Sequence, residues 1–510
     1  MPRTLSTPMP KTARPTSAEE GARPAPVMSA GQVRIGFAVC LVTILLAVLD
    51  TNIVSAATVP IVRDLDPVHG VDKIPWLISS FALASAAVLP LYGKLCDTIG
   101  AKKVFVGAIA TFLAGSALCG AAQSMGELIA ARAVQGIGGG GLMSVTMVVI
   151  AQLKGPGDGD GGGGRGKGGS IGGIVAGAGM ALGPWVGGTL ADHASWRWIF
   201  YVNLPVGLAV LAAAVVVLRL PVAPVRHRID YPGAALAAAF SVSLLLVTEW
   251  GGKDYAWSSP VIIGLAVTGV ASLALFLRRQ TTAAEPILPL SMFKVPAVRL
   301  GFAIQGLVGA AMMGTLVYVM IYLQVVRGIE ATSAGLYLIP MAIGMTAVGL
   351  GSERLGARGW SQKTFVLTGT VAATAALGLL ATTRVATNLW QIRAELLLMG
   401  MGFGLLIGQL IHIVQAAAPA RQLGVATTGV RFFQTLGNAL GAAVFGTILS
   451  RVYESKGPGG STSALRTLHG PSHASGVHAL TTGMDVVFVA GAVLMAAAAY
   501  LATRLPRAAV

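Results

Sequence analysis

The feature that most constrains this chain is its succession of long apolar stretches, each close to the length that crosses a lipid bilayer. One helical crossing needs about 20 predominantly apolar residues. Backbone inside lipid must satisfy its own hydrogen bonds, so each stretch is predicted to be an α-helix. Fourteen spans are predicted, near residues 33–57, 74–92, 103–122, 128–151, 170–190, 198–218, 232–250, 260–277, 298–323, 333–351, 364–382, 391–415, 423–449 and 483–503.

Composition agrees with an integral membrane protein and excludes several other classes. Only 11% of the 510 residues are charged and the mean hydropathy is +0.74, whereas about a quarter of a soluble protein is charged. The formal charge of +16 would indicate nucleic-acid binding only if the basic residues clustered on one folded face, and here they are scattered among loops. Cys40, Cys96 and Cys119 have no ligand spacing, so neither a metal site nor a disulfide framework is predicted.

The basic residues also predict how the chain is oriented. If the N-terminus is cytoplasmic, about two thirds of the 36 lysines and arginines fall in segments on the inner side, as the positive-inside rule requires. An even number of spans places both termini in the cytoplasm. We therefore expect a multi-pass protein of the cytoplasmic membrane.

The spans divide as six, two and six. Residues 93–103, after the second span, are weakly echoed by residues 351–358, which suggests a duplicated bundle with an insertion between its copies. The residues before the first span lack an apolar core and are not expected to be a signal peptide. The predicted parts are a disordered cytoplasmic tail (1–32), an N-terminal six-helix bundle (33–220), two inserted transmembrane helices with flanking linkers (221–296), a C-terminal six-helix bundle (297–504) and a cytoplasmic tail (505–510).

The fifth span carries an unusual run of glycine. Gly179, Gly183 and Gly187 recur every four residues and would share one helix face, where a second backbone can approach closely. Pro184 should bend the helix beside them, and Gly188 follows. This pattern fits a moving interface, but it also fits ordinary close packing in any membrane bundle.

The same stretch, G-x-x-x-G-P-x-x-G-G, resembles the antiporter motif of the major facilitator superfamily. Further stretches are similar to motifs of that superfamily's fourteen-span drug:proton antiporter branch, and together they cover nearly all of the chain after residue 33. They are residues 49–60 in the first span, 93–103 in the loop after the second, 128–136 in the fourth, 196–207 at the start of the sixth and 322–335 around the end of the ninth. The resemblance implies an all-α major facilitator fold of two six-helix bundles with two inserted helices.

The resemblance also implies a conformational gate. Its residues would be Gly93, Asp97, Gly100 and Lys103 in the loop motif, together with the glycines and proline of span five. Thr98 and Ala101 stand where the family often has arginine, which departs from the usual charge network. The plain alternative for Asp97 is a helix cap or a solvated loop charge.

Asp50 and Arg132 are charges placed within predicted spans. An ionised side chain at mid-membrane costs about 2.5–3.5 kcal/mol on insertion scales, so each needs a cavity, a partner or neutralisation. A carboxyl group that gains and loses a proton there could couple transport to a proton gradient, with Arg132 promoting proton release. The alternatives are a neutral, hydrogen-bonded Asp50 and an Arg132 that only fixes its helix in place.

Other polar side chains within or beside the spans are candidates for the substrate cavity. They could contact substrate, or they could join helices. The candidates are Gln135, Asn203, Gln324, Arg431, Gln434 and Asn438. Glu249, Glu395 and Asp485 lie near predicted span ends and are interpreted as interfacial charges.

Two glycine-rich patterns imitate nucleotide-binding loops. Residues 136–141 fit G-x-G-x-x-G and residues 161–168 nearly spell a P-loop, but no strand leads into either, and Gly168 replaces the Ser or Thr that would hold Mg²⁺. The sequence therefore predicts no nucleotide-binding site that could power the protein.

We therefore expect an exporter of amphipathic drugs or antibiotics, cationic or neutral, that exchanges them for protons by alternating access. It should be no enzyme, need no cofactor or metal beyond the proton gradient, bind no nucleic acid and work as a monomer in the bilayer. A membrane-embedded sensor or enzyme is the alternative from another class. An enzyme would need a clustered acid–base pair, and none is visible in the sequence. A metabolite transporter of the same fold also remains open, as do the compound and the proton stoichiometry.

Overall fold

The computed structural model describes residues 28–66, 73–153, 183, 186–187, 189–190, 193–220, 230–252, 255–329, 335–419, 422–456 and 470–506. The predicted N-terminal tail up to residue 27, the glycine-rich loop 155–169 and most of span 170–190 lie outside this part. Its helices are α1 (Ala30–Ala56), α2 (Thr58–Leu65), α3 (Ile74–Ile99), α4 (Ala101–Ala121), α5 (Met125–Leu153), α7 (Trp198–Tyr201), α8 (Asn203–Val217), α9 (Tyr231–Trp250), α10 (Pro260–Thr282), η2 (Leu290–Lys294), α11 (Pro296–Ile321), η3 (Tyr322–Val326), α13 (Ile339–Ala357), α14 (Gln362–Leu380), α15 (Leu389–Ala417), α16 (Leu423–Lys456) and α17 (Gly470–Thr503).

Within the described residues, 12 helices are long and apolar enough to cross a membrane. Each of them falls on a predicted span. The other two predicted spans are 170–190, mostly outside the described part, and 333–351, most of which α13 covers. The all-helical membrane architecture is therefore confirmed, whereas the count of fourteen stays a prediction.

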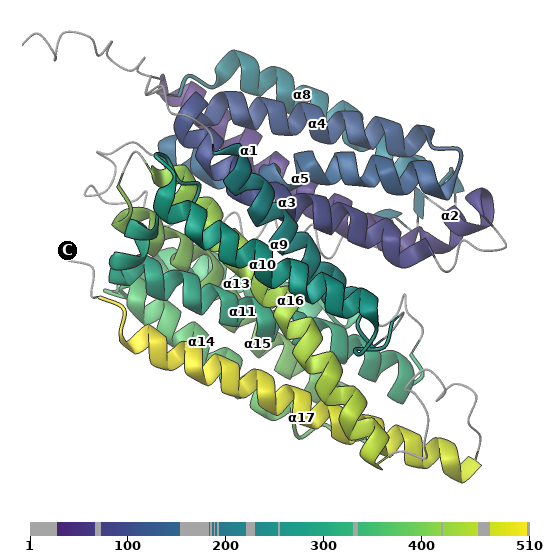
Figure 1. The fold of residues 1–510 in the computed structure, drawn as a ribbon. Coiled ribbons are helices and arrows are strands. Elements are labelled where there is room, and N and C mark those ends of the chain that lie inside the picture. The colour runs from purple at the N-terminus through teal and green to yellow at the C-terminus, as the bar shows by residue number, and fades with distance from the viewer. Residues whose placement is uncertain are drawn as a thin grey trace, which may run out of the picture.

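The long helices form two bundles that lie next to each other (Figure 1). Helices α1, α3, α4, α5 and α8 share one buried core around Phe105 and Phe112. Helices α11 and α13 to α17 share a second core around Phe403 and Phe445. The bundles meet chiefly where α3 packs against α16. We call the side where α1 begins and α17 ends the terminal side.

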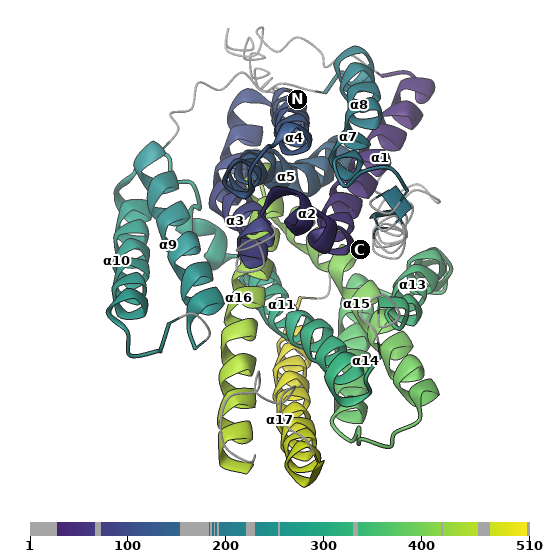
Figure 2. The same cartoon turned by 90° about the vertical axis from the view of Figure 1, so that its right-hand side faces the viewer.

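Helices α9 and α10 pair with each other and stand beside the two bundles (Figure 2). Helix α9 contacts both α3 and α16, so it touches each bundle at their shared boundary. The Trp76 and Trp250 rings meet edge to face, with centroids 5.3 Å apart. This peripheral position agrees with the predicted insertion.

Helices α16 and α17 are 34 residues each, so they extend well past the predicted spans 423–449 and 483–503. At 1.5 Å per residue each is about 51 Å long, against a hydrocarbon core of about 30 Å. The extra turns could not be predicted from the length of the apolar stretches, because a helix that leaves the membrane can continue with polar residues. His478, which precedes the predicted span 483–503, lies in α17, and its side chain is exposed.

Candidate functional site

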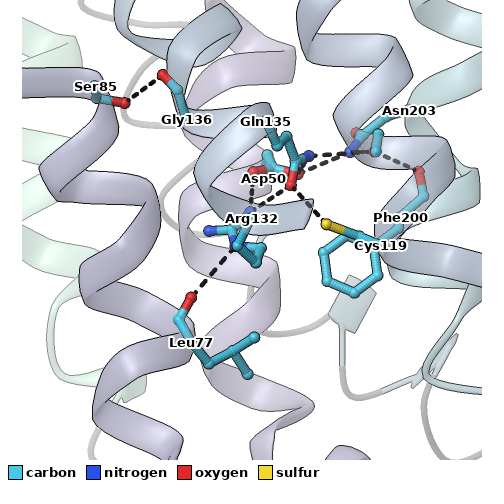
Figure 3. A network of polar contacts seen from close by, with 10 residues as sticks. Asp50, Leu77, Ser85, Cys119, Arg132, Gln135, Gly136, Phe200 and Asn203 are labelled. Carbon is cyan, nitrogen blue, oxygen red and sulfur yellow. Dashed lines mark hydrogen bonds and ion pairs between the residues drawn. The ribbon is translucent and has the colours of Figure 1, made fainter. Parts of the chain in front are cut away.

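Glycines bring α3, α4 and α5 close enough to build a polar site between them. A Cβ at Gly115 of α4 would overlap the Gln135 backbone of α5, and a Cβ at Gly136 of α5 would overlap the Phe81 carbonyl of α3. The G-x-G-x-x-G pattern that begins at Gly136 is thus a helix contact surface. Ser85 adds a hydrogen bond to the Gly136 carbonyl, 2.8 Å long (Figure 3).

At the centre of this site Asp50 of α1 forms an ion pair with Arg132 of α5 (Figure 3). Arg132 Nη1 donates to Asp50 Oδ2 over 2.9 Å. The side chains are 0% and 2% exposed, so the pair is shielded from solvent. The two in-membrane charges that the sequence placed on separate spans are therefore partners, and each compensates the charge of the other.

Two amide side chains complete the carboxylate's surroundings. Gln135 Nε2 and Asn203 Nδ2 each donate to Asp50 Oδ1 over 2.8 Å. Ser116 Oγ accepts from both amides, at 3.2 and 3.0 Å, and donates to the Phe200 carbonyl. Gln135 and Asn203 were predicted to line a substrate cavity. In this structure both are 0% exposed and hold the carboxylate of Asp50.

Arg132 is held on several sides. Its guanidinium lies over the Phe81 ring, 4.3 Å from the centroid, and its Nε donates to the Leu77 carbonyl over 3.4 Å. Arg132 Nη1 also donates to Gln135 Oε1 over 2.7 Å. Charge-assisted hydrogen bonds of this kind offset part of the cost of burying both ions. Arg132 is thus both the partner of Asp50 and a pin between α3 and α5.

The buried carboxylate can exchange a proton only if the packing around it opens. The hydrogen bonds to Asp50 that appear in Figure 3 all use the carboxyl group as acceptor, and the one from Arg132 is charge-assisted. Protonation would remove the negative charge and leave Arg132 without its counter-ion. Because α1, α5 and α8 all contribute side chains to the network, it joins three helices at one carboxyl group.

A second polar contact joins the two bundles at the terminal side. Asp97, near the end of α3, accepts from the Gly424 and Val425 backbone N–H groups at the start of α16, over 2.7 and 3.0 Å. The carboxylate also faces the positive end of the α16 dipole. Asp97 is therefore a helix cap, as the plain alternative held, but it caps a helix of the opposite bundle.

Glycine permits this close approach. A Cβ at Gly93 would overlap the Thr428 hydroxyl, and a Cβ at Gly424 would lie 2.5 Å from the Gly93 carbonyl oxygen. Gly100 links α3 to α4 with φ of 92°, a conformation that side chains rarely adopt. Lys103, predicted with them, is exposed and does not join the contact. We call the contact of Gly93 and Asp97 with Gly424 and Val425 the latch.

The linker after α10 lies against the latch. Lys94 Nζ is 3.1 Å from Glu285 Oε2. A cavity of about 450 Å³ opens beside this pair, and Asp97, Ser291 and Gln422 are among its lining residues. The inserted helices are therefore connected to the latch through their linker, and α9 contacts α3 and α16 directly.

Little of the span-five glycine motif is described. Gly187 packs against Ile53 of α1, and a Cβ there would lie 2.5 Å from the Ile53 carbonyl oxygen. In this conformation Gly187 therefore contacts α1 of the same bundle. Gly183 is buried, while Gly179, Pro184 and Gly188 lie outside the described residues. Contact of this face with the other bundle in a second conformation stays a prediction.

In the C-terminal bundle, Arg431 Nη1 donates to Gln434 Oε1 over 3.0 Å. Asn438 follows one turn later on α16, so the predicted stripe of three is present. Gln324 lies in η3, beyond the end of α11, and does not belong to this stripe on α16. Sequence reasoning missed Gln305 of α11, which is 1% exposed. It also missed Ser116, because a lone serine in an apolar helix carries no signal.

At the other side of the membrane the sixth-span motif ties α2 to α7. Trp196 Nε1 and Arg197 Nη1 both donate to Asp64 Oδ2, over 2.9 and 2.6 Å. These hydrogen bonds hold the pKa of the Asp64 carboxyl below its ordinary value. Glu395, which was predicted to be an interfacial charge, is 3% exposed, and Gln391 Nε2 donates to its Oε1 over 2.8 Å.

Similar proteins agree with this architecture. The MFS-type transporter Rv1877 of Mycobacterium tuberculosis is 34% identical over 87% of this chain, and the chain spans 63% of that relative's length. The multidrug transporter protein MdtP of Bacillus subtilis is 32% identical over 80% of this chain and 74% of its own. Multidrug resistance protein 3 of the same organism is 33% identical over 82% of this chain and 79% of its own length.

Solved structures show the same fold. The human organic anion transporter MFSD10 superposes with a TM-score of 0.61 at 18% identity, covering 92% of this chain and 99% of its own. The proton:xylose symporter XylE superposes with a TM-score of 0.61 at 14% identity, covering 93% and 96%. The sequence profile of the Major Facilitator Superfamily matches residues 39–442. The chain therefore belongs to the Major Facilitator Superfamily, whose members are transporters and not enzymes.

Proposed function

We propose that this transporter exports amphipathic drugs or antibiotics across the cytoplasmic membrane in exchange for protons. The observation that carries the proposal is the Asp50–Arg132 pair, a buried carboxylate whose counter-charge among the described residues is a cation on another helix. A reversible proton carrier needs a site of this kind, since its charge must change while the surrounding helices sense the change. No cofactor is required, because the proton gradient supplies the energy.

The exchange has two half-steps. A proton from the outside binds an Asp50 oxygen, neutralises the carboxylate and breaks the ion pair with Arg132. The freed guanidinium keeps its bond to Gln135, while the bonds that Asp50 accepted weaken, so α1 can move relative to α5 and α8. When the site opens to the cytoplasm, Arg132 favours the ionised carboxylate again and the proton leaves. Substrate crosses in the opposite direction during the return.

The latch supplies the alternation. It holds the terminal side closed, which the distribution of basic residues assigns to the cytoplasm. A carboxylate at a helix N-terminus contributes about 0.3–2 kcal/mol, enough to bias two conformations and small enough to be overcome in each cycle. Opening this side requires Asp97 to leave Gly424 and Val425.

The substrate class rests on the relatives, several of which are named multidrug transporters or efflux pumps. The described helices also suit transport of amphipathic compounds, because a few polar clusters are set among predominantly apolar spans. We propose that the chain works as a monomer, with both termini in the cytoplasm.

The test uses purified protein in liposomes that contain no ATP. A proton gradient alone should drive accumulation of a dye such as rhodamine 6G or fluorescein, and a protonophore should abolish it. Glu454→Gln, which neutralises an exposed carboxylate, serves as the matched control and should transport like wild type. Dye movement that ignores both the gradient and the protonophore would contradict proton coupling.

A further inference from the structure

The C-terminal bundle contains a cation without a counter-charge. Arg431 has one polar partner, Gln434, and its Nε–H is buried without a hydrogen bond. Among the described residues no carboxylate pairs with it. Arg132, by contrast, has Asp50. An unpaired guanidinium within the membrane is expensive, so Arg431 needs an anion that the described chain does not provide.

Buried amide atoms on α11 and α16 also lack hydrogen-bond partners. Both amide atoms of Gln305, which is 1% exposed, are without a hydrogen bond, and so is Asn438 Oδ1. A Cβ at Gly309 would lie 3.0 Å from Asn438 Oδ1, so α11 and α16 are in close contact at this level. Gln305 precedes Gly309 by one turn and shares its helix face. The unpaired groups therefore gather between α11 and α16.

Such a gathering indicates a missing partner. More than about nine in ten buried polar groups in proteins are hydrogen-bonded. If these side chains only joined α11 to α16, their donors and acceptors would bond to one another, as those of Asp50, Gln135 and Asn203 do. Only the Arg431–Gln434 bond is made.

The position of Arg431 on α16 makes the site reachable from the boundary between the bundles. The Thr428 hydroxyl lies against Gly93 of α3. Arg431 comes three residues later, on nearly the same helix face. The guanidinium therefore lies on the face of α16 that is turned toward the N-terminal bundle, where alternating access would expose it.

Resting on the proposed transport function, we propose that Arg431, Gln305, Gln434 and Asn438 form a subsite for the anionic group of the transported compound. The substrates are then amphipathic organic acids that carry a carboxylate and a nearby hydroxyl group. This departs from the cationic or neutral compounds that the sequence led us to expect.

The unpaired atoms define the chemistry of that ligand. A guanidinium offers parallel N–H donors that match the two oxygens of a carboxylate. Gln305 Nε2 can donate one more hydrogen bond to the anion. Gln305 Oε1 and Asn438 Oδ1 are acceptors, so they require a donor, which a hydroxyl group supplies. A cationic amine would satisfy the acceptors only and would face repulsion from Arg431.

Two dyes with one ring system test the charge preference. Fluorescein carries a carboxylate and a phenolic hydroxyl, whereas rhodamine 6G has the same xanthene core, an ester and a positive charge. Equilibrium binding to wild type in nanodiscs should favour fluorescein at mildly acidic pH, where its carboxylate is ionised and its phenol keeps the proton. Arg431→Gln should weaken fluorescein binding by about 10–100-fold, since hydrogen bonds to charged groups contribute most. Its rhodamine 6G affinity should not fall.

The controls separate charge from folding. Arg393→Gln removes a cation of the same bundle that lies over the Tyr337 and Trp390 rings, and it should leave fluorescein binding unchanged. Arg431→Lys should recover part of the lost affinity. If Arg431→Gln does not fold, Gln305→Leu replaces it in the binding experiment. Leucine removes the unpaired amide, so this variant should fold. In a purely structural role this change would raise the melting temperature and spare binding.

The proposal is overturned if Arg431→Gln binds fluorescein as wild type does, or if wild type prefers rhodamine 6G. Binding needs no gradient, so the result stands apart from proton coupling. Gradient-driven export of rhodamine 6G without fluorescein binding would overturn the subsite alone. Fluorescein binding that depends on Arg431, in a protein that ignores the proton gradient, would overturn the proposed exchange alone.

Discussion

Asp50 accepts hydrogen bonds from three side chains on two other helices, and its chemistry follows from that arrangement. The sequence marked Asp50 and Arg132 because charge inside a membrane span is costly. It could not pair them, since they are 82 residues apart and the pairing depends on how α1 packs against α5. Gln135 was visible as a neighbour of Arg132 on one helix face, whereas the roles of Ser116 and Asn203 required three helices in register.

Asp64 permits a prediction about pH. Trp196 and Arg197 donate hydrogen bonds to Asp64 and lower its pKa. These hydrogen bonds therefore stabilise the fold at pH values above the ordinary aspartate pKa of about 4. That stabilisation is lost as the pH falls through the lowered pKa of Asp64. Asp64→Asn should reduce stability at neutral pH by about 1 kcal/mol, because the carboxylate is half exposed.

Melting temperatures of wild type and Asp64→Asn in detergent measure this. Their difference should shrink as the pH drops below about 4. A difference that stays constant with pH would mean that the Asp64 charge does not stabilise the fold.

At the scale of elements, α3 and α16 carry the boundary between the bundles. The loop motif predicted that residues 93–103 act as a gate, but the partner of Asp97 could not be read from the sequence. The backbone N–H groups of Gly424 and Val425 donate to Asp97, and a backbone donor carries no residue signature because nearly every residue has one. Lys94 of the same motif pairs with Glu285 of the linker after α10.

Asp97→Asn should weaken the latch, because an amide carries no charge toward the α16 dipole. A loss of about 1 kcal/mol would shift the balance between closed and open states roughly fivefold. Spin labels at the exposed positions Lys103 and Ser361, one on each bundle, measure the distance across the terminal side. The open population should increase in Asp97→Asn, and an unchanged distance distribution would remove Asp97 from the gate.

At the scale of the whole molecule, apolar length predicted most of the architecture. Twelve described helices fall on predicted spans, because the bilayer dictates both length and composition. Helices α16 and α17 run past their predicted spans, because outside the bilayer neither length nor composition is constrained. The arrangement of α9 against both bundles could not be predicted, since lipid-facing helices are apolar all round.

Topology gives a prediction for the inserted pair. Ser258 lies between α9 and α10, and Thr282 ends α10, and both side chains are exposed. A cysteine at Ser258 should react with a membrane-impermeant maleimide from outside the cell, and a cysteine at Thr282 only after the membrane is opened. The native cysteines that the structure describes are buried and should stay silent. Reaction of both positions from the same side would contradict two crossings.

The central claim is that Asp50 carries the proton. The most direct measurement compares two modes of transport by Asp50→Asn in liposomes: uptake driven by a proton gradient, and exchange of labelled for unlabelled dye at equal pH. Asparagine has similar volume and can hydrogen-bond, so the variant should fold and mimic the protonated state. We expect gradient-driven uptake to be lost while exchange continues. Undiminished gradient-driven uptake by Asp50→Asn would contradict the account.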